Sequence, residues 1–241
     1  MTKKKDEKFK IGDAAAQSDE VNIGFLLDMS GSMMSVKTAT ISGFNEYIQT
    51  MKAKSPNARF TLMVFSSIEI REVFTDVAIK DVPELTDALY VPSGGTQLYD
   101  SVAYIIRTMS KRIESKTNKN TLLNIMTDGE ENESKEYSRD SIKKLIGEKE
   151  VEGWVVGYMG ANQDSWAVAR SIGVKTSNSL NYDVNNMRGV FSKAADASAL
   201  YTASRGVMKH GLFNNMVDDV DDVDDVDAVS NLNGTNKTGS K

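Results

Sequence analysis

The sequence VNIGFLLDMSGS, residues 21–32, decides the fold, because it joins a continuous apolar run to a cluster of oxygen-bearing side chains. An uninterrupted apolar run such as 21–27 is typical of a strand that is buried on both faces of a parallel sheet. Asp28, Ser30 and Ser32 follow on alternate residues, and alternate side chains of an extended segment point the same way. Hard divalent cations prefer such oxygen ligands. The stretch therefore predicts a buried strand that ends in a loop able to hold an ion such as Mg²⁺.

The composition is that of a globular protein with a single domain. The 241 residues are 40% hydrophobic and 26% charged, and no apolar run approaches the roughly 18 residues that cross a membrane. There is no cysteine, which excludes disulfides and thiolate zinc sites. The lysine-rich segment 1–10 lacks the apolar stretch of a secretion signal. We therefore expect a cytoplasmic protein without membrane contact, or a virion-associated one if a phage encodes it.

The net charge of −5 is concentrated near the C-terminus. Residues 211–241 contain seven Asp and two Lys, whereas residues 1–210 contain equal numbers of acidic and basic residues. A neutral body does not favour binding to nucleic acid. We expect a flexible charged arm at 1–20, a folded domain at 21–210 and an acidic tail at 211–241. The tail is expected to be disordered, because dense like charge accompanies few bulky apolar side chains.

Predicted strands and helices alternate through the body of the chain. Apolar runs predict strands at 21–27, 59–65, 68–74, 121–126, 154–159 and 174–176. Helical spacing and local composition predict helices at 36–54, 83–89, 97–113, 138–150, 165–172 and 185–209. This alternation predicts an α/β fold, with a central, mostly parallel sheet covered by helices on both faces. We expect segment 68–74 at an edge of that sheet.

Three loops with oxygen-bearing side chains follow or flank these strands. Asp28 lies at the end of the first strand, and Thr127-Asp128-Gly129 directly follows the run at 121–126. The third loop, Pro92–Thr96, precedes the helix that is expected from Gln97. Ligands of open α/β sheets bind beyond the carboxyl ends of the strands. We therefore expect the three loops to meet at one edge of the sheet.

These loops resemble the metal-ion-dependent adhesion site of von Willebrand factor type A domains. The matching positions are Asp28, Ser30, Ser32, Thr96 and Asp128. The resemblance implies a Rossmann-like, three-layer α/β/α fold with one antiparallel edge strand, and binding of Mg²⁺, Mn²⁺ or Ca²⁺. It implies that the hydroxyls bind the ion directly or nearly so, whereas the two carboxylates act largely through waters and hydrogen bonds. It also implies a partner protein that completes the coordination with an Asp or Glu carboxylate.

The residues favour a binding role over a catalytic one. Two carboxylates only balance the charge of a divalent ion, and if they act through waters rather than by direct contact, the ion still attracts a further carboxylate. A Mg²⁺-dependent hydrolase would want a second carboxylate where Ser30 stands, and no general base is evident. His210 is the only histidine, and its place beside Gly211 argues against a Ser-His-Asp triad. We predict a non-enzymatic, metal-dependent interaction or adhesion module; the alternative is a structural component of a phage virion or of its assembly.

Several of these residues also have a plainer interpretation. Each candidate ligand, taken singly, fits a helix cap or a turn. The segment Gly160–Asp164 resembles a stretch of small bacterial and phage von Willebrand type A proteins and could contact the rim of the metal site, yet Asn162 or Asp164 also suits a helix cap. Met33 and Met34 form either a contact surface or part of the core. The glutamates that follow Asp128 form either a second cation site or a solvated acidic loop.

The acidic tail repeats Val-Asp-Asp from Val217 to Asp227. A site that binds a carboxylate thus shares the chain with a run of carboxylates. One hypothesis is that the tail enters its own site or that of a neighbouring copy, since a tethered ligand can reach mM effective concentration. The alternative is a tail that only keeps the protein soluble.

Overall fold

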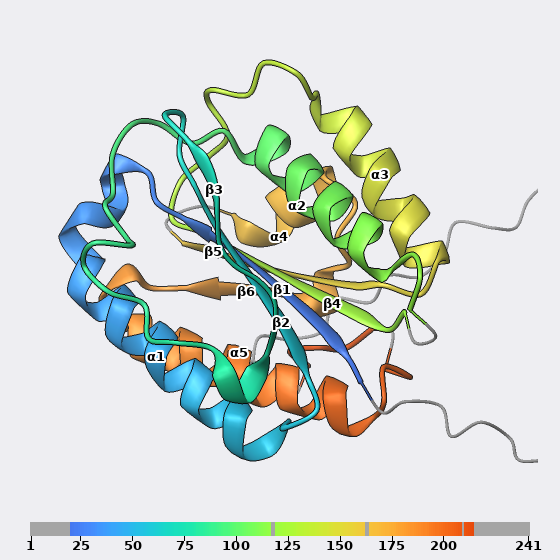
Figure 1. Cartoon of the computed structure of the whole chain (residues 1–241). Coiled ribbons are helices and arrows are strands. Elements are labelled where there is room, and N and C mark those ends of the chain that lie inside the picture. The colour runs from blue at the N-terminus through green and yellow to red at the C-terminus, as the bar shows by residue number, and fades with distance from the viewer. Residues whose placement is uncertain (1–19, 117–118, 162–163, 209, 215–241) are drawn as a thin grey trace, which may run out of the picture.

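The computed structural model of the chain describes residues 20–116, 119–161, 164–208 and 210–214. Its centre is a six-stranded sheet in the order β3-β2-β1-β4-β5-β6 (Figure 1). The strands are β1 Asn22–Asp28, β2 Arg59–Phe65, β3 Ile70–Ala78, β4 Thr121–Thr127, β5 Val155–Ala161 and β6 Ser179–Tyr182. All neighbours pair in parallel except β2 and β3. The predicted sheet, mostly parallel with one antiparallel edge strand, is confirmed.

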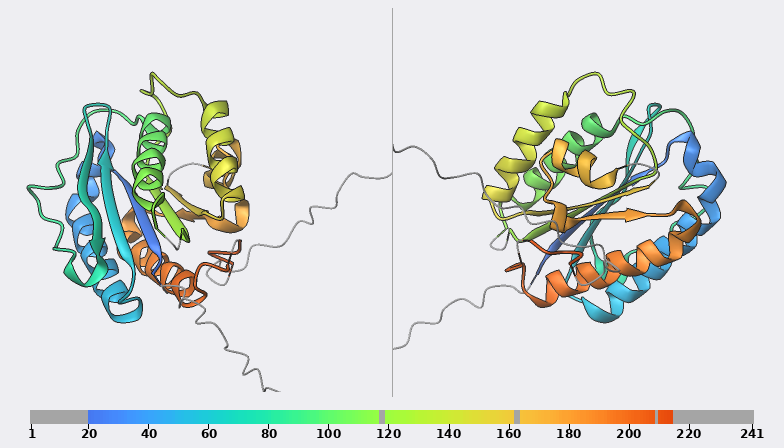
Figure 2. Two further views of the ribbon diagram at one scale, coloured as in Figure 1. Left: turned by 45° about the vertical axis from the view of Figure 1, so that its right-hand side comes forward. Right: turned by 180° about the vertical axis from the view of Figure 1, so that it is seen from behind.

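Helices cover both faces of the sheet and make it the middle of three layers (Figures 1 and 2). One face packs against α1 and α5, which lie side by side, and the other packs against α2, α3 and α4. The bounds are α1 Lys37–Lys54, α2 Leu98–Ile113, α3 Arg139–Val151, α4 Ser165–Ser171 and α5 Met187–Ala203. The predicted α/β/α architecture is therefore confirmed.

The central strand β1 is buried along its whole length. Phe25 faces the layer of α1 and α5, whereas the adjacent Leu26 faces the layer of α2 and α3. The ring of Phe25 lies 5.9 Å from that of Phe44, 5.3 Å from that of Tyr47 and 5.9 Å from that of Phe191, measured between centroids. A strand with two apolar faces has to lie between two helical layers, which explains its uninterrupted apolar sequence.

The segment 83–89 is a loop, and the prediction of a short helix there was wrong. The backbone N–H of Leu85 donates to Asn45 Oδ1 at 2.8 Å, and the Asn45 Nδ2 donates to the Leu85 carbonyl at 3.0 Å. Leu85 is buried, so its backbone polar groups need partners. The side chain of Asn45 on α1 supplies them, and helical hydrogen bonds are not required.

The last strand lies later in the chain than predicted. Segment 174–176 forms no strand, because the Val174 N–H donates to the Ala169 carbonyl at 2.8 Å and closes the end of α4. The closing helix is also shorter than the predicted 185–209. It begins after Asn186, whose side chain accepts a hydrogen bond from the Gly189 N–H at 3.1 Å.

The packed part of the chain extends to Phe213, a little past the boundary expected at 210. Leu212 and Phe213 are buried, and a Cβ on Gly157 of β5 would lie 2.8 Å from Leu212. The predicted arm, apart from Glu20, and the tail from residue 215 lie outside the described residues.

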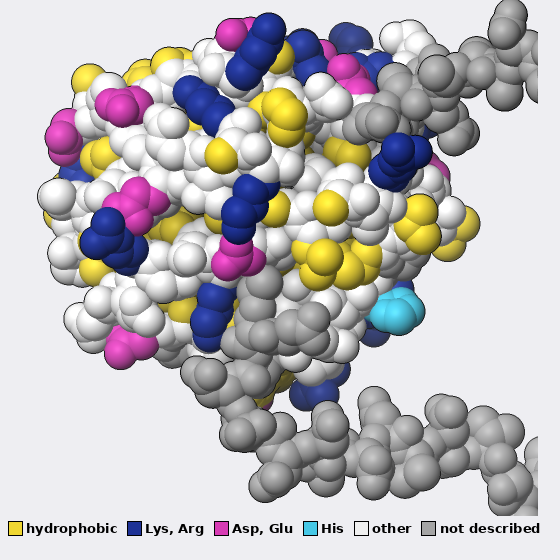
Figure 3. Space-filling view, turned by 90° about the horizontal axis from the view of Figure 1, so that it is seen from below, with side chains coloured by type: hydrophobic (Ala, Val, Ile, Leu, Met, Phe, Trp, Pro, Cys, Tyr) yellow, Lys and Arg dark blue, Asp and Glu magenta, His cyan; other side chains and the backbone are white. Residues whose placement is uncertain are grey.

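Among the described helices, none is long and apolar enough to cross a membrane. The face seen in Figure 3 intersperses basic with acidic side chains.

Gly43 on α1 lies where α1 and α5 approach closely, and Gly43→Ala is expected to destabilise the protein. A Cβ at this position would lie 2.5 Å from Cδ2 of Phe191, whose ring is buried and held by the rings of Phe25 and Phe44. Such overpacking lowers the free energy of unfolding by about 1–3 kcal/mol. Urea unfolding measures this change.

Gly147→Ala on α3 is the matched control, because nothing lies within 4 Å of a Cβ built there. It is expected to raise the free energy of unfolding by about 0.5–1 kcal/mol through helix propensity. Equal effects of the two substitutions would contradict the close packing of α1 on α5.

Candidate metal centre

Strands β1 and β4 are parallel neighbours, so their carboxyl ends bring Asp28 and Thr127 together at one edge of the sheet. Asp28 is fully buried. Its Oδ1 accepts a hydrogen bond from the Ser30 N–H, and its Oδ2 accepts one from the Thr127 hydroxyl, each at 2.6 Å. Both carboxylate oxygens are therefore oriented by the protein itself, which suits a residue that orders a site rather than one that approaches an ion freely.

A chain of hydroxyls and a second carboxylate continues from Asp28. The Oγ atoms of Ser30 and Ser32 lie 3.0 Å apart, and the Ser32 hydroxyl donates to Asp128 Oδ1 at 2.7 Å. Asp128 follows β4 directly and is largely buried. The structure thus brings four of the five predicted ligands into one hydrogen-bonded chain.

Thr96, the fifth predicted ligand, lies beside this chain. Its backbone N–H donates to Asn132 Oδ1 at 2.9 Å, and the Asn132 N–H donates to the Thr96 carbonyl at 3.0 Å. A Cβ on Gly129 would lie 3.1 Å from Thr96 Oγ1, which places the hydroxyl next to Asp128. The predicted meeting of three loops is therefore what the structure shows; binding of a metal there stays a prediction.

Glycine at position 94 lets the loop Pro92–Thr96 pass close to the loop that follows Asp28. The Gly31 N–H donates to the Gly94 carbonyl at 2.8 Å, so the two loops are hydrogen bonded through their backbones. Gly94 has φ +72°, and a Cβ there would lie 2.7 Å from Ser67 Oγ and 2.9 Å from Ile68 Cγ1. Only glycine adopts this conformation without strain in so little space.

Two buried tyrosines support the site and were not predicted from the sequence. The Tyr90 hydroxyl donates to the Asp28 carbonyl at 2.6 Å, and the Tyr182 hydroxyl donates to the Thr127 carbonyl at 3.1 Å. Burial, together with the nearby carboxylates of Asp28 and Asp128, raises the pKa of both hydroxyls well above the ordinary value. They therefore remain donors. Their positions, distant in sequence from the strands that they support, offered no local signal.

The acidic loop after Asp128 has a structural role for one of its glutamates. The carboxylate of Glu131 accepts hydrogen bonds from the Tyr99 N–H at 2.9 Å and from the Ser134 N–H at 2.7 Å. In return, Asp100 on α2 accepts a hydrogen bond from the Tyr137 N–H at 2.9 Å. Glu131 thus ties this loop to the first turn of α2.

Elsewhere, Asp164 caps α4 by accepting a hydrogen bond from the Ala167 N–H at 3.0 Å, in agreement with its interpretation as a helix cap.

Burial sets the electrostatics of the two aspartates. Loss of hydration raises the pKa of Asp28 to about 6, although hydrogen bonds from Thr127 and Ser30 oppose the shift. Burial also raises the pKa of Asp128. A neighbouring cation would favour the ionised carboxylates and oppose both shifts. The pair is therefore electrostatically suited to a positive charge.

The donor set fits a hard divalent ion. Three hydroxyls and two carboxylates converge here, all of them oxygen ligands, and two negative charges match one divalent ion. No group of three or more Asp, Glu or His side chains that could hold a metal occurs within the described residues. An ion at this edge would accordingly depend on the hydroxyls of Ser30, Ser32 and Thr96 for direct contacts, with Asp28 and Asp128 ordering those hydroxyls.

In metal-free solution, the raised pKa of Asp28 is expected to make the fold less stable as the pH increases. An unfolded Asp has a pKa of about 3.9, so between this value and the folded value of about 6 the folded state binds the additional proton. Stability therefore falls through this interval, by about 3 kcal/mol for this group.

Asp28→Asn does not titrate and should remove that part of the pH dependence. The measurement is urea unfolding in EDTA at pH 4 and pH 7 for both proteins. If both proteins lose the same stability between the two pH values, Asp28 does not carry the effect.

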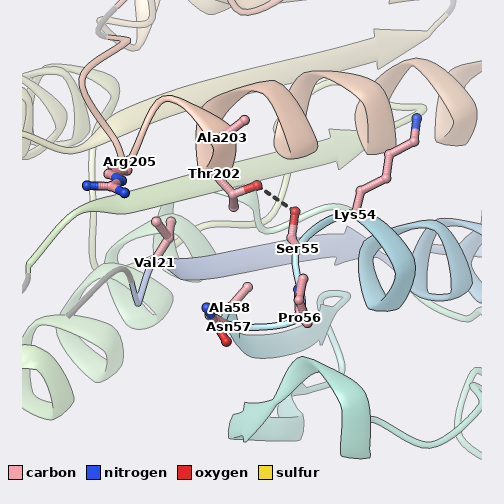
Figure 4. Close-up of a pocket in the computed structure, with 9 residues that line it drawn as sticks. All are labelled: Val21, Lys54, Ser55, Pro56, Asn57, Ala58, Thr202, Ala203 and Arg205. Atoms are coloured by element: carbon pink, nitrogen blue, oxygen red, sulfur yellow. Dashed lines mark hydrogen bonds between the residues drawn. The ribbon is translucent and has the colours of Figure 1, made fainter.

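Two surface hollows lie at the opposite edge of the sheet, where β1 and β4 begin. One, of about 210 Å³, lies between the ends of α1 and α5, and the hydroxyls of Ser55 and Thr202 contact each other across it at 2.5 Å (Figure 4). The other, of about 490 Å³, is lined by Ser110, Lys119 and Trp154 among others. Neither hollow includes any of the five predicted metal ligands.

Comparison with known proteins points to one family. The family model of the von Willebrand factor type A domain matches residues 22–195. A comparison with curated proteins finds no match.

Solved structures with this fold come from animals, bacteria and a protozoan parasite. The chain is similar to proximal thread matrix protein 1 from the mussel byssus, with TM-score 0.57, 15% identity, and coverage of 75% of this chain and 48% of that one. It is similar to a von Willebrand factor type A protein from Catenulispora acidiphila, with TM-score 0.52, 14% identity, and coverage of 76% and 43%. It is also similar to the manganese-loaded Plasmodium vivax TRAP protein, with TM-score 0.53, 16% identity, and coverage of 74% of each chain. The chain spans less than half of the first two, and at these identities the likeness shows the fold alone.

Proposed function

The chain belongs to the von Willebrand factor type A domain family, and on that premise we propose that it is a metal-dependent protein-interaction module. Domains of this family are commonly adhesion or interaction modules. In our proposal, Ser30, Ser32, Thr96, Asp28 and Asp128 hold Mg²⁺ or Mn²⁺, and a carboxylate from a partner protein completes the coordination.

The observation that carries this proposal is the hydrogen-bonded chain from Asp28 to Asp128. Asp28 holds the Ser30 backbone at 2.6 Å, and Asp128 holds the Ser32 hydroxyl at 2.7 Å. Because each carboxylate is engaged by the protein, the lone pairs of the hydroxyls remain for an ion. An ion held mainly by neutral oxygens keeps its positive charge. It then attracts an external carboxylate more strongly than it attracts a water molecule.

Neither alternative function is supported by an observation in the described structure. A hydrolase needs a general base near the metal. His210 lies beside Gly211, whose N–H donates to Ser177 Oγ at 3.2 Å, just before the start of β6. That position is at the edge of the sheet away from Asp28. No feature of the described residues favours a static role in a virion.

The proposal is tested with Mn²⁺ and short peptides. Binding of Mn²⁺ by the full chain is followed by water proton relaxation, which reports the water molecules on the bound ion. Two peptides are compared, each acetylated at its N-terminus and amidated at its C-terminus, so that only a side chain can supply a carboxylate. The Gly-Gly-Glu-Gly-Gly peptide should lower this relaxation, because its carboxylate displaces a water molecule from the ion. The matched Gly-Gly-Gln-Gly-Gly peptide should leave it unchanged, and EDTA should abolish the signal of bound Mn²⁺. The same response to both peptides, in the full chain and in a variant with Asn at all seven Asp positions of 217–227, would contradict a carboxylate-binding site.

A further inference from the structure

Exposed apolar side chains lie on or against the loops that form the candidate metal centre. Met34, Ile68 and Val91 are 53%, 69% and 49% exposed, and we call these three residues the apolar rim. Large hydrophobic side chains with this exposure are uncommon in the described structure, and they come here from three separate loops. Such a rim is suited to apolar side chains that flank a bound carboxylate.

Hydrogen bonds and contacts tie the apolar rim to the metal-binding loops. Ile68 lies against Gly94, where a Cβ would be 2.9 Å from its Cγ1. The Val91 N–H donates to the Met29 sulfur at 3.3 Å, and Met29 lies between Asp28 and Ser30 in sequence. Met34 follows in the 3-10 turn Gly31–Val36, while its neighbour Met33 is buried. Of the two methionines, only Met34 is therefore exposed and available as a contact surface, and Met33 belongs to the core.

The Val-Asp-Asp repeat at 217–227 matches this arrangement in sequence, although it lies outside the described residues. Each of its seven Asp residues is directly adjacent to a Val. Whichever Asp is bound, an apolar side chain therefore lies next to the carboxylate. Residues 1–210 carry no net charge, so the repeat is the concentrated source of carboxylates within the molecule.

We propose that segment 217–227 occupies the metal centre of its own chain, with one Asp as the carboxylate ligand and the adjacent Val on the apolar rim. This inference rests on the proposed function, because it names the ligand of the same site. The tail then acts as an internal competitor that an external partner has to displace.

The tail is long enough to reach the site. The described chain ends at Asn214, after Phe213 packs beside Gly157 of β5. From Asn214 to Asp227, the extended chain spans up to about 43 Å. A seven-residue strand such as β1 is roughly 23 Å long, so the later Asp residues can pass from the body of the sheet to its carboxyl edge. Tethering then gives an effective concentration in the mM range.

Repulsion from the acidic loop keeps this contact weak enough to be displaced. Glu130 and Glu133 are exposed, and Glu133 lies against Gly95, where a Cβ would be 2.7 Å from its Cγ. Like charges close to the site oppose a ligand with seven carboxylates. A contact that tethering supports and charge opposes is suited to regulation rather than to permanent closure.

Because the sequence has no cysteine, a single introduced cysteine can carry a spin label, and this allows a direct test by NMR. A nitroxide is attached to Thr38→Cys, an exposed position on the first turn of α1, in otherwise full-length ¹⁵N-labelled protein. Adding Mg²⁺ should cause a selective loss of amide signals from 217–227. The loss should disappear in Asp28→Asn and in a variant with Asn at all seven tail Asp positions. Ser at the four Val positions of the repeat should reduce it.

The same spectra separate this inference from the proposed function. Mg²⁺-dependent shifts of the Ser30 and Ser32 amides report binding of the ion. If these amides shift and the tail signals persist, the inference is wrong while the proposed function stands; if these amides do not shift, both are wrong. Spin-labelled protein without ¹⁵N, mixed with ¹⁵N-labelled protein without the label, should leave the tail signals intact. Loss of tail signals in that mixture means that the tail binds a second copy, which overturns the proposal of binding within one chain.

Discussion

Asp28→Ala is expected to lower the affinity for Mg²⁺ and Mn²⁺ by about 100-fold, the upper end of the range for residues that orient metal ligands. The substitution removes one of two negative charges and both hydrogen bonds that order Ser30 and Thr127. The lost carboxylate is fully buried, and its ionised form is unfavourable without a cation. Loss of this buried charge therefore offsets part of the destabilisation caused by the cavity that truncation to Ala leaves. Isothermal titration with Mn²⁺ measures the change in affinity.

Two further variants make this result decisive. Asp28→Asn keeps the size of the side chain and should lose most of the affinity. In EDTA at pH 4, where Asp28 is protonated in the folded state, it should unfold at a urea concentration close to that of the unmodified protein. Asp196→Asn removes the same charge from an exposed position on α5, where Asp196 pairs with Lys54 at 2.8 Å, and should bind Mn²⁺ normally. Wild-type affinity in Asp28→Ala would refute the assignment of the site.

Phe44→Ala is expected to lower the free energy of unfolding by about 3–5 kcal/mol. Phe44 is fully buried between α1 and the sheet, and its ring contacts those of Phe25, Tyr47, Phe60 and Phe191 at centroid distances of 5.9–6.3 Å. Truncation removes the centre of this cluster, and the large surrounding rings cannot collapse into the cavity without leaving their own contacts. Urea unfolding measures the loss.

Leu200→Ala on α5 serves as the control for this prediction. Leu200 is 45% exposed, so its truncation should change the free energy of unfolding by only about 0.5 kcal/mol. A loss in Phe44→Ala no larger than that of the control would show that the aromatic cluster does not stabilise the layer between α1, α5 and the sheet.

Local pattern predicted most of the secondary structure, because burial imposes a period on each element. The apolar runs at 21–27 and 121–126 became the buried neighbours β1 and β4, and the helical spacing at 97–113 became α2. Prediction failed where a partner from elsewhere in the chain decided the conformation. The loop at 83–89 is held by the side chain of Asn45, which no local pattern announces.

The candidate site, too, was predicted only in part from local sequence. Alternation of Asp28, Ser30 and Ser32 after an apolar run was visible in the sequence, as were the loops that carry Thr96 and Asp128. Their support was not, since Tyr90 holds Asp28 and Asn132 holds Thr96 from positions far along the chain from the residue that each one holds. Thr127 directly precedes Asp128, so adjacency could have suggested its role.

The sequence by itself therefore determined most of the strands and helices and the oxygen-bearing residues at the strand ends, because periodicity and spacing act over a few residues. The tertiary structure alone decided that Asp28 is fully buried, that both its oxygens are engaged and that Met34, Ile68 and Val91 lie exposed on or against the loops of the candidate site. Burial and hydrogen bonding depend on segments that only the folded chain brings together, and those two properties set the pKa of Asp28.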